Sequence, residues 1–507
     1  MIFNFSGAFW GNLRNFRNSQ AFDELLSKPE TTLDQVLDDE DVVQEMKNQN
    51  PKFLALYSSP SFTPARLHEL LSLLVTEPPA DADHRRGHKH PFLAAELMGC
   101  EAPQLLQSIF EDPDLLALLF SLLSSPSLNL TLAGYFSKLF HILASRNCPR
   151  LLTILCAQDH IYLDQLVQQV RARSIADCVL RVLLYDDAEE YVQERQGLVE
   201  RLVGMVCEGG DQAVHAVSIL SECLQRNTEM KSWKVVFSLL FCPSTFMRLF
   251  ECFAGPSASA FSLLALLLGH PFFLELVGEG LLQLEEMLEG SVHLLESLLD
   301  LENTQEPSTG VGEARLKCVE MLLAIYRADI QALEGVVGRS KLPDLCTQLF
   351  FHYPWNSFLH QTYLQLLQSV LNCPNVSQKS IFMQSSGLVS RLLEWKTEAK
   401  LESGRVVRAG YMGHAIRLAQ LVNKALEASV DLQISAEMQL EWTSFVANTL
   451  STVLELEGRP YGGSKPTDTL EDDSDEPNDI KEEVKSTQKF SSFLASIDKK
   501  EPEEQLE

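Results

Sequence analysis

Residues 31–50, TTLDQVLDDEDVVQEMKNQN, predict two short helices joined by a run of four acidic residues. Thr32 precedes Gln35 by three positions, which is the spacing of a capping box at a helix start. Two apolar stripes with helical spacing define the helices, and their members are Leu33, Val36 and Leu37, then Val42, Val43 and Met46. Between them, Asp38–Asp41 concentrates negative charge. Two interpretations stay open: a solvated helix start, where backbone N–H groups favour carboxylates, or an exposed acidic surface for a partner.

The same helical spacing of apolar residues continues along most of the chain. It recurs in residues 115–125, 132–146, 162–170, 175–184, 197–206, 213–224, 314–326, 358–371 and 416–426. Turn-forming residues interrupt these segments, and no long alternating strand pattern competes with them. We therefore predict an all-α fold, an α-solenoid of armadillo or HEAT type built from paired helices. The segments share no clear consensus, so a compact α-bundle stays open as the alternative.

Composition suggests three parts along the chain. Residues 1–20 form an N-terminal arm, residues 21–457 a helical-repeat domain, and residues 458–507 an acidic tail. The tail is poor in aromatic residues and rich in Asp, Glu, Ser, Pro and Lys, which predicts disorder. Polar loops are predicted at residues 76–91 and 302–313, and the second loop could divide the repeat domain.

Charge restricts the partners of this chain. Its 507 residues contain 69 acidic and 41 basic residues, for a formal net charge of −28. A strongly acidic chain argues against nucleic acid and against anionic membrane surfaces, because both require a cationic footprint. It remains compatible with a partner that has a basic surface.

Cysteine usage and hydropathy predict a cytoplasmic location, with the nucleus as a second possibility. The 11 cysteines include no C-x-x-C pair and several stand among apolar residues, which is typical of reduced thiols in a protein core. The N-terminus has no signal-peptide pattern. Residues 252–274 lack formal charge, but Gly and Pro divide them, so we predict a buried helix and a turn instead of a membrane span.

The sequence contains no motif for catalysis, for a cofactor or for a metal. HExxH, G-x-S-x-G, the P-loop and a complete G-x-G-x-x-G are all missing. His84, His88 and His90 lie close together, but the basic residues among them oppose a dication and no thiolate pair completes a zinc set. We interpret this segment as a solvated basic loop that could dock an acidic partner segment. The chain is therefore predicted not to be an enzyme.

Six blocks of sequence resemble a known family. They are LDQVLDDEDVVQE at 33–45, AFW at 8–10, HPFLAAE at 90–96, LAGYFSK at 132–138, PWN with FLH at 354–360, and GYMGH at 410–414. Taken in their order along the chain, they resemble the SAPS-domain family, the regulatory subunits of the type-6 protein serine/threonine phosphatase. Met46 stands where the family pattern has Cys, and residues 243–305 are hard to match.

The resemblance implies a non-catalytic regulatory and scaffolding subunit. It would bind a type-6-like phosphatase catalytic subunit, together with an ankyrin-repeat subunit, and direct the enzyme to substrates. The two-metal chemistry would then lie in the partner. The residues that we predict to bind partners on this basis are Asp38, Asp39, Glu40, Asp41, Gln44, Glu45, Tyr135, Trp355, Asn356, Tyr411 and His414.

Each family block also has a purely structural interpretation. Gly134 and Gly410 could allow close helix packing, Pro354 could cap a turn, and Trp355 could belong to the core. Two other functions stay open as well: a helical-repeat adaptor for trafficking or transport without a phosphatase, and a cryptic hydrolase.

The acidic tail contains candidate phosphorylation sites. Asp472 follows Thr469 by three residues, and acidic residues surround Ser474, which are contexts that acidophilic kinases favour. Mass spectrometry of protein isolated from cells would test both sites.

Overall fold

The computed structural model describes residues 20–28, 30–58, 63–185, 191–226, 233–255, 257–302, 310–394, 398–400, 406–428 and 434–458. The helices of this part, including short 3-10 and π-helical turns marked η, are α2 (Leu33–Asp38), α3 (Val42–Lys47), α4 (Pro51–Ser58), α5 (Thr63–Val75), η1 (Arg85–Lys89), α6 (His90–Gly99), α7 (Pro103–Glu111), α8 (Pro113–Ser121), η2 (Leu122–Ser124), α9 (Leu130–Gln168), α10 (Arg173–Leu183), α11 (Val192–Glu208), α12 (Asp211–Arg226), α13 (Trp233–Leu240), α14 (Pro243–Glu251), η5 (Cys252–Ala254), α15 (Ala258–Leu268), α16 (Phe273–Val277), η6 (Gly278–Gly280), α17 (Leu281–Leu299), α18 (Glu313–Arg327), α19 (Gln331–Arg339), α20 (Leu342–His352), α21 (Ser357–Asn372), α22 (Val376–Ser385), α23 (Leu388–Leu393), α24 (Met412–Ala428), α25 (Ala436–Phe445), η7 (Val446–Leu450) and α26 (Ser451–Gly458). The all-α prediction is confirmed.

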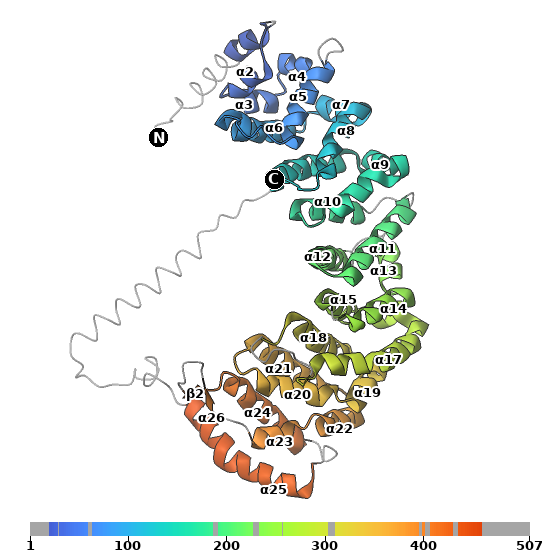
Figure 1. The fold of residues 1–507 in the computed structure, drawn as a ribbon, viewed down its shortest axis with the longest axis vertical. Helices are drawn as coiled ribbons and strands as arrows, with labels where there is room; N and C mark the ends of the chain where they lie inside the picture. The colour runs from blue at the N-terminus through green and yellow to red at the C-terminus, as the bar shows by residue number, and fades with distance from the viewer. Residues whose placement is uncertain are drawn as a thin grey trace, which may run out of the picture. The chain divides into compact units, whose positions relative to one another are not determined.

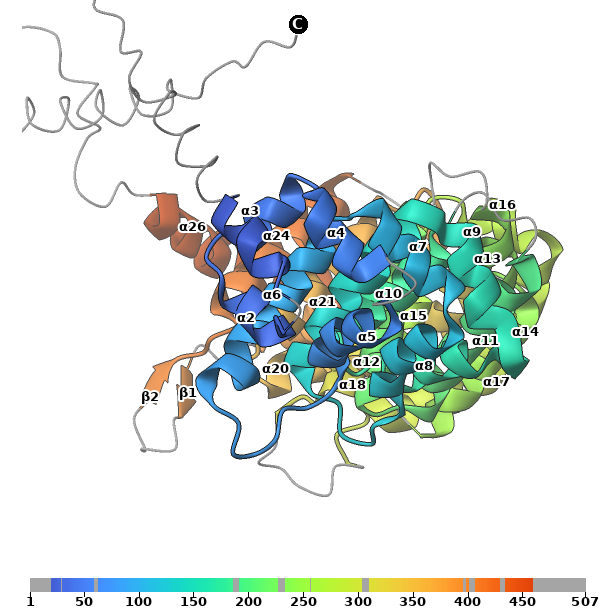
Figure 2. The same ribbon diagram turned by 90° about the horizontal axis from the view of Figure 1, so that it is seen from above.

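Helices pack with a period of three along the chain. α12 contacts α15, α15 contacts α18, α18 contacts α21, and α21 contacts α24. A second series of contacts joins α11, α14, α17 and α20. Its members α11, α14 and α17 lie along one edge of the stack, beside α12, α15 and α18 (Figures 1 and 2). A repeat of three helices is the armadillo arrangement, so the predicted solenoid is confirmed, although its unit is a triplet and not the predicted pair.

The helix α15 shows why the middle of the chain is so apolar. Its residues Phe261, Leu263, Leu264, Leu267 and Leu268 are all buried. Because α12 covers one side and α18 the other, a helix here needs an apolar surface wider than a single stripe. The prediction of a buried helix in this stretch is confirmed. Among the residues that the structure describes, no helix combines the length and the apolar character that crossing a bilayer requires.

The N-terminal helix pair forms as its sequence predicts. The Thr32 hydroxyl accepts a hydrogen bond from the backbone N–H of Gln35, and the Gln35 side chain accepts one from the N–H of Thr32, which completes the capping box. Leu33, Val36 and Leu37 are buried. This pair packs against α5 and α6.

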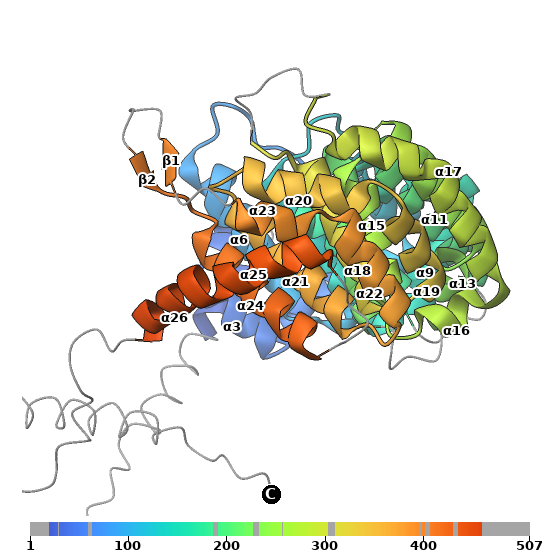
Figure 3. The same ribbon diagram turned by 90° about the horizontal axis from the view of Figure 1, so that it is seen from below.

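Two local predictions were wrong, and one short element was not predicted. Residues 76–91 are not wholly a loop, because a helical turn begins at Arg85 and α6 begins at His90. The segments 132–146 and 162–170 belong to one helix, α9, which contains Pro149 and in which His160 has a φ of 64°. A short antiparallel hairpin, β1 (Glu398–Lys400) and β2 (Val406–Arg408), pairs Glu398 with Arg408 and lies beside the helical stack (Figure 3).

The chain divides into two compact units, Met1–Gln439 and Leu440–Glu507. The described part of the second unit is helical and ends at Gly458. Residues 1–19 of the predicted arm 1–20, the tail beyond Gly458 and its sites Thr469 and Ser474 lie outside the described residues. The predicted domain boundaries therefore stay predictions.

Candidate partner-binding site

Two of the family-like motifs, separated by more than 50 residues in the sequence, meet at one place. The turn between α20 and α21 carries Pro354 and Trp355, and it lies against Gly410 at the entry to α24. A Cβ atom on Gly410 would lie 2.4 Å from the Pro354 carbonyl oxygen and 2.7 Å from Cε3 of Trp355. Only glycine fits this approach, so the structural interpretation of Gly410 is confirmed. We call this region the motif cluster: Tyr353–His360 and Gly410–His414.

Two predicted partner-binding residues hold the motif cluster together. The side chain of Tyr411 is only 5% exposed, and its ring lies 5.3 Å from that of Phe351, centroid to centroid. The Asn356 side chain accepts a hydrogen bond from the N–H of Leu359 at 3.0 Å, and thereby caps α21. Tyr411 therefore supports the site from beneath its surface, and the half-buried Asn356 fixes the start of α21.

A pair of histidines fills the interior of the motif cluster. His360 is 1% exposed, and its Nε2 lies 2.9 Å from the carbonyl oxygen of Tyr353, so Nε2–H donates to that oxygen. The ring of the half-buried His414 lies 5.5 Å from the ring of His360. Burial lowers the pKa of His360 to about 4, with a further contribution from His414, and burial also lowers the pKa of His414. His360 is therefore neutral at physiological pH.

The buried His360 predicts that mild acid destabilises the fold. Its pKa is lower folded than unfolded, so the stabilisation is fully present above pH 6.5 and is lost as the pH falls towards 4. Between pH 8 and pH 5.5 we expect a loss on the order of 1 kcal/mol in the free energy of unfolding, since the unfolded chain takes up the proton first. Urea unfolding of His360→Gln should show a flatter dependence on pH than the parent chain. His352→Gln, at an exposed position, is the control, and its free energy of unfolding should depend on pH as steeply as that of the parent chain. If the free energy of unfolding of His360→Gln depends on pH as steeply as that of the parent chain, the prediction is wrong.

Two aromatic side chains stand out from the motif cluster into solvent. Trp355 is 53% exposed and Phe358 is 76% exposed, and they flank the cap residue Asn356. We call them the Trp355–Phe358 patch. Neighbouring exposed aromatic residues are frequent anchors at protein interfaces. The interpretation of Trp355 as a core residue is therefore wrong.

The acidic run between α2 and α3 is partly neutralised by its own chain. Asp38 Oδ2 lies 2.7 Å from Nη1 of Arg85, and its Oδ1 lies 2.8 Å from Nζ of Lys89 and 3.3 Å from Nε2 of His90. The Lys89 hydrogen bond is the largest of the effects that lower the pKa of Asp38. The segment predicted as a solvated basic loop thus contacts Asp38 through three of its side chains.

Other members of the acidic segment also serve local structure. Asp39 accepts a hydrogen bond from the N–H of Asp41 at 3.0 Å. Glu45 is buried, and its Oε2 accepts from the Asn50 side chain at 2.8 Å. The Gln44 side-chain amide donates to Oδ1 of Asn48, one helical turn away, at 2.9 Å.

Two carboxylates of the run remain available to a partner. Glu40 is exposed and Asp41 is half-exposed. Within the described residues, neither side chain takes part in a hydrogen bond or an ion pair.

Tyr135, another predicted partner-binding residue, lies in α9 and is half-buried. A Cβ on the neighbouring Gly134 would meet nothing within 4 Å, so the suggestion that Gly134 allows close packing was wrong.

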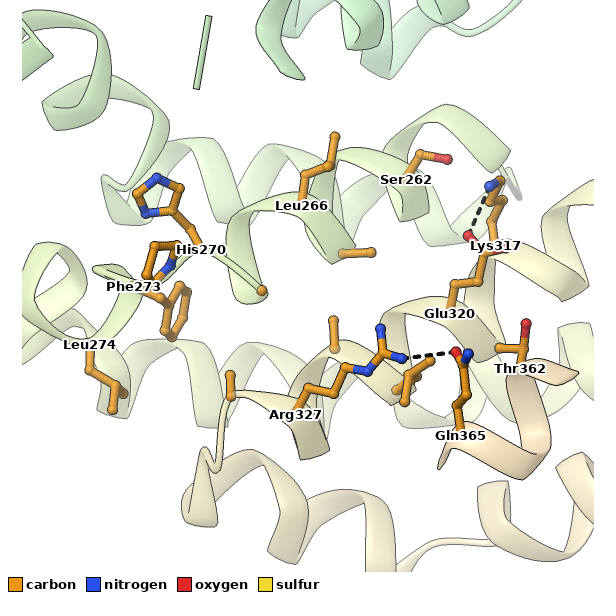
Figure 4. A pocket seen from close by; sticks show the side chains of 16 residues that line it. Ser262, Leu266, His270, Phe273, Leu274, Lys317, Glu320, Arg327, Thr362 and Gln365 are labelled. Atoms are coloured by element: carbon orange, nitrogen blue, oxygen red, sulfur yellow. Dashed lines mark hydrogen bonds and ion pairs between the residues drawn. The ribbon is translucent and has the colours of Figure 1, made fainter. Parts of the chain in front are cut away.

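A cavity of about 740 Å³ lies between α15, α18 and α21 (Figure 4). Its charged side chains have partners within the chain: Lys317 Nζ lies 2.8 Å from Glu320, and Arg327 Nη2 lies 2.8 Å from the Gln365 amide oxygen. Burial lowers the pKa of His270 at one end. Lys317 and Glu320 neutralise each other, so Arg327 leaves the lining with one net positive charge. Donors that could hold a metal converge elsewhere, where ligand atoms of Asp329, Glu334 and Cys373 lie within 4.8 Å of one another.

Comparison with known proteins supports the family resemblance. Residues 337–458, which include the motif cluster, match the sequence model of the family SAPS, SIT4 phosphatase-associated protein. The chain is 27% identical to serine/threonine-protein phosphatase 6 regulatory subunit 1 of Mus musculus over 86% of its own length and 59% of that protein. It is 26% identical to regulatory subunit 3-A of Xenopus laevis, again over 86% and 59%. The resemblance to the SAPS-domain family is confirmed, and the chain spans about 59% of the length of these relatives.

A comparison with solved structures adds little. A chain from a study of the interaction between cadherin and β-catenin aligns over 82% of this chain and 95% of its own length, with 14% identity. The TM-score is 0.26, so the solenoid assignment rests on the helix contacts of this chain.

Proposed function

We propose that this relative of the SAPS-domain family is a non-catalytic regulatory and scaffolding subunit. It binds the catalytic subunit of a type-6 protein serine/threonine phosphatase and directs that enzyme to its substrates. The proposal is supported by the family match at residues 337–458 and by the similarity to regulatory subunits of serine/threonine-protein phosphatase 6. Phosphoester hydrolysis would take place in the partner, and this chain would supply effective concentration and orientation of the substrate.

The observation that carries this proposal is the motif cluster. Gly410 allows two family-like motifs to interlock, and the interlocked turn presents Trp355 and Phe358 to solvent. Solvent exposure of two large aromatic residues on a rigid support costs hydration free energy unless a partner covers them. We propose that the Trp355–Phe358 patch contacts the catalytic subunit.

Affinity purification of the tagged chain from its own cells, followed by mass spectrometry, tests the function. We expect a type-6 phosphatase catalytic subunit at near-stoichiometric amount, and phosphatase activity that depends on this subunit. Recovery of the folded chain without any phosphatase would overturn the proposal and favour an adaptor for trafficking or transport. Activity of the purified chain alone would favour a hydrolase.

The exposed acids Glu40 and Asp41 should accelerate partner binding. Because Asp38 and Asp39 serve the local fold, the informative variant is Glu40→Gln with Asp41→Asn. We expect a several-fold slower association with the catalytic subunit and a weaker dependence on salt, since rim charges act mainly on the association rate. The control, Glu285→Gln with Glu286→Gln in α17, removes the same charge elsewhere. Equal association rates for the two double variants would show that the acidic run has no special role.

The remaining assignments extend the same proposal. We propose that an ankyrin-repeat subunit joins the complex and that Thr469 and Ser474 are phosphorylated. We also propose a cytosolic location, with the nucleus as a second one, because none of the 11 cysteines forms a disulfide. Cross-linking of the purified complex and phosphopeptide mapping test the first two assignments.

A further inference from the structure

Three metal-ligating side chains from separate elements converge at the junction of two repeats. Asp329 lies in the turn between α18 and α19, Glu334 lies in α19, and Cys373 follows the end of α21. The backbone of Asp329 has a φ of 52°, in the left-handed region. This conformation forms part of the turn that connects α18 to α19. The three residues span 44 positions, so the fold and not a local motif brings them together.

The distances between the donor atoms suit a tetrahedral metal. Cys373 Sγ lies 3.2 Å from Oε2 of Glu334 and 3.8 Å from Oδ1 of Asp329. Around zinc, with a Zn–S bond of 2.3 Å and a Zn–O bond of 2.0 Å, tetrahedral sulfur and oxygen ligands are separated by about 3.5 Å. Both observed distances lie within about 0.3 Å of that value, so small rotations of the side chains would bring the three donors to ligating distance.

Glu334 provides an independent indication of a bound cation. Its side chain is 0% exposed, and within the described residues its Oε1 has no hydrogen-bond partner, while Oε2 faces the Cys373 thiol. Among the described residues, Glu334 forms no ion pair with Lys, Arg or His. A buried carboxylate without a cation or a full set of donors is costly. A divalent ion between these residues would supply the missing positive charge.

We propose that Asp329, Glu334 and Cys373 bind one divalent cation of the zinc class, with a water molecule as the fourth ligand. The thiol proton passes to solvent when the thiolate binds, and the soft sulfur ligand selects zinc over magnesium and calcium. Asp329 is exposed and gives the ion a path from solvent, whereas Glu334 and Cys373 close the inner side. The ion would fasten the α18–α19 turn to the end of α21 and so stiffen the junction between repeats.

Cobalt substitution of the purified full chain tests the site, and the test is independent of any phosphatase. After chelation and dialysis, one equivalent of Co²⁺ should bind per chain and give the near-ultraviolet charge-transfer absorption of a cobalt–thiolate bond. Zinc should displace the cobalt and raise the unfolding temperature. Cys373→Ser should abolish the charge-transfer band, and Asp329→Asn should weaken binding by at least tenfold while preserving the turn, since Asn tolerates the left-handed region.

A matched cysteine variant separates this site from adventitious binding. Cys156→Ser removes a half-buried thiol of α9 and should leave the cobalt spectrum unchanged. The proposal is overturned if the folded parent chain shows no charge-transfer band, or if the band persists in Cys373→Ser. It is also overturned if Asp329→Asn, shown by circular dichroism to be folded, binds cobalt as tightly as the parent.

Discussion

Replacing Gly410 with alanine should destabilise the chain by about 3 kcal/mol, the upper end of the usual cost of overpacking. The new methyl group would lie 2.4 Å from the Pro354 carbonyl oxygen, a backbone atom that cannot rotate away. It would also press on the Trp355 ring at 2.7 Å, so the turn before α21 has to move as a whole. Equilibrium unfolding in urea, followed by far-ultraviolet circular dichroism, measures the change.

Gly413, three residues further along the same motif, is the matched control. It lies in α24, and a Cβ there would meet nothing within 4 Å. Gly413→Ala should therefore be neutral or stabilise the chain by up to about 1 kcal/mol, because alanine is the better helix former. If both variants unfold at the same urea concentration, the close approach at Gly410 does not hold the two motifs together.

The helical architecture could be predicted from sequence because it depends on local, periodic signals. The capping box at Thr32 and the apolar stripe of Leu33, Val36 and Leu37 both specify a helix without knowledge of distant residues. The triplet repeat could not be predicted, since it depends on which helix packs against which, and the repeats share no consensus. Two predicted helices also joined into α9, which continues through Pro149.

The site was predictable only in outline. The family-like motifs identified Trp355 and Tyr411, but sequence could not show that one is exposed and the other buried. Phe358 and His360 were not predicted as site residues, because an aromatic or a histidine at helical spacing is as frequent in a core as on a surface. The Asp38 ion pairs join residues 47 to 52 positions apart, and Cys373 lies 44 positions from Asp329 and 39 from Glu334, so only the fold reveals these pairings.

Truncation of Phe358 to alanine should weaken binding of the catalytic subunit by about 2 kcal/mol, or roughly 30-fold in Kd, as is typical for an aromatic interface anchor. Phe358 is the more informative member of the Trp355–Phe358 patch, because its side chain is 76% exposed and contributes little to the fold. Alanine is a good residue for the first turn of α21, so the free energy of unfolding should change by less than about 0.5 kcal/mol. Calorimetry with the purified catalytic subunit gives the Kd.

Leu282, which is 71% exposed on α17, is the matched control for an apolar residue outside the patch. Leu282→Ala should bind the catalytic subunit like the parent chain, since truncation of an exposed residue outside the interface removes no contact. Trp355→Ala should weaken binding at least as much as Phe358→Ala, but its stability has to be measured too, because Trp355 also packs on Gly410. If the Phe358 and Leu282 variants bind the catalytic subunit with equal affinity, and the parent chain also binds it, the interface lies outside the Trp355–Phe358 patch. The proposed regulatory function would then still stand. If the parent chain itself does not bind the catalytic subunit, the proposed regulatory function is wrong. One set of titrations therefore distinguishes the proposed function from the proposed position of the interface.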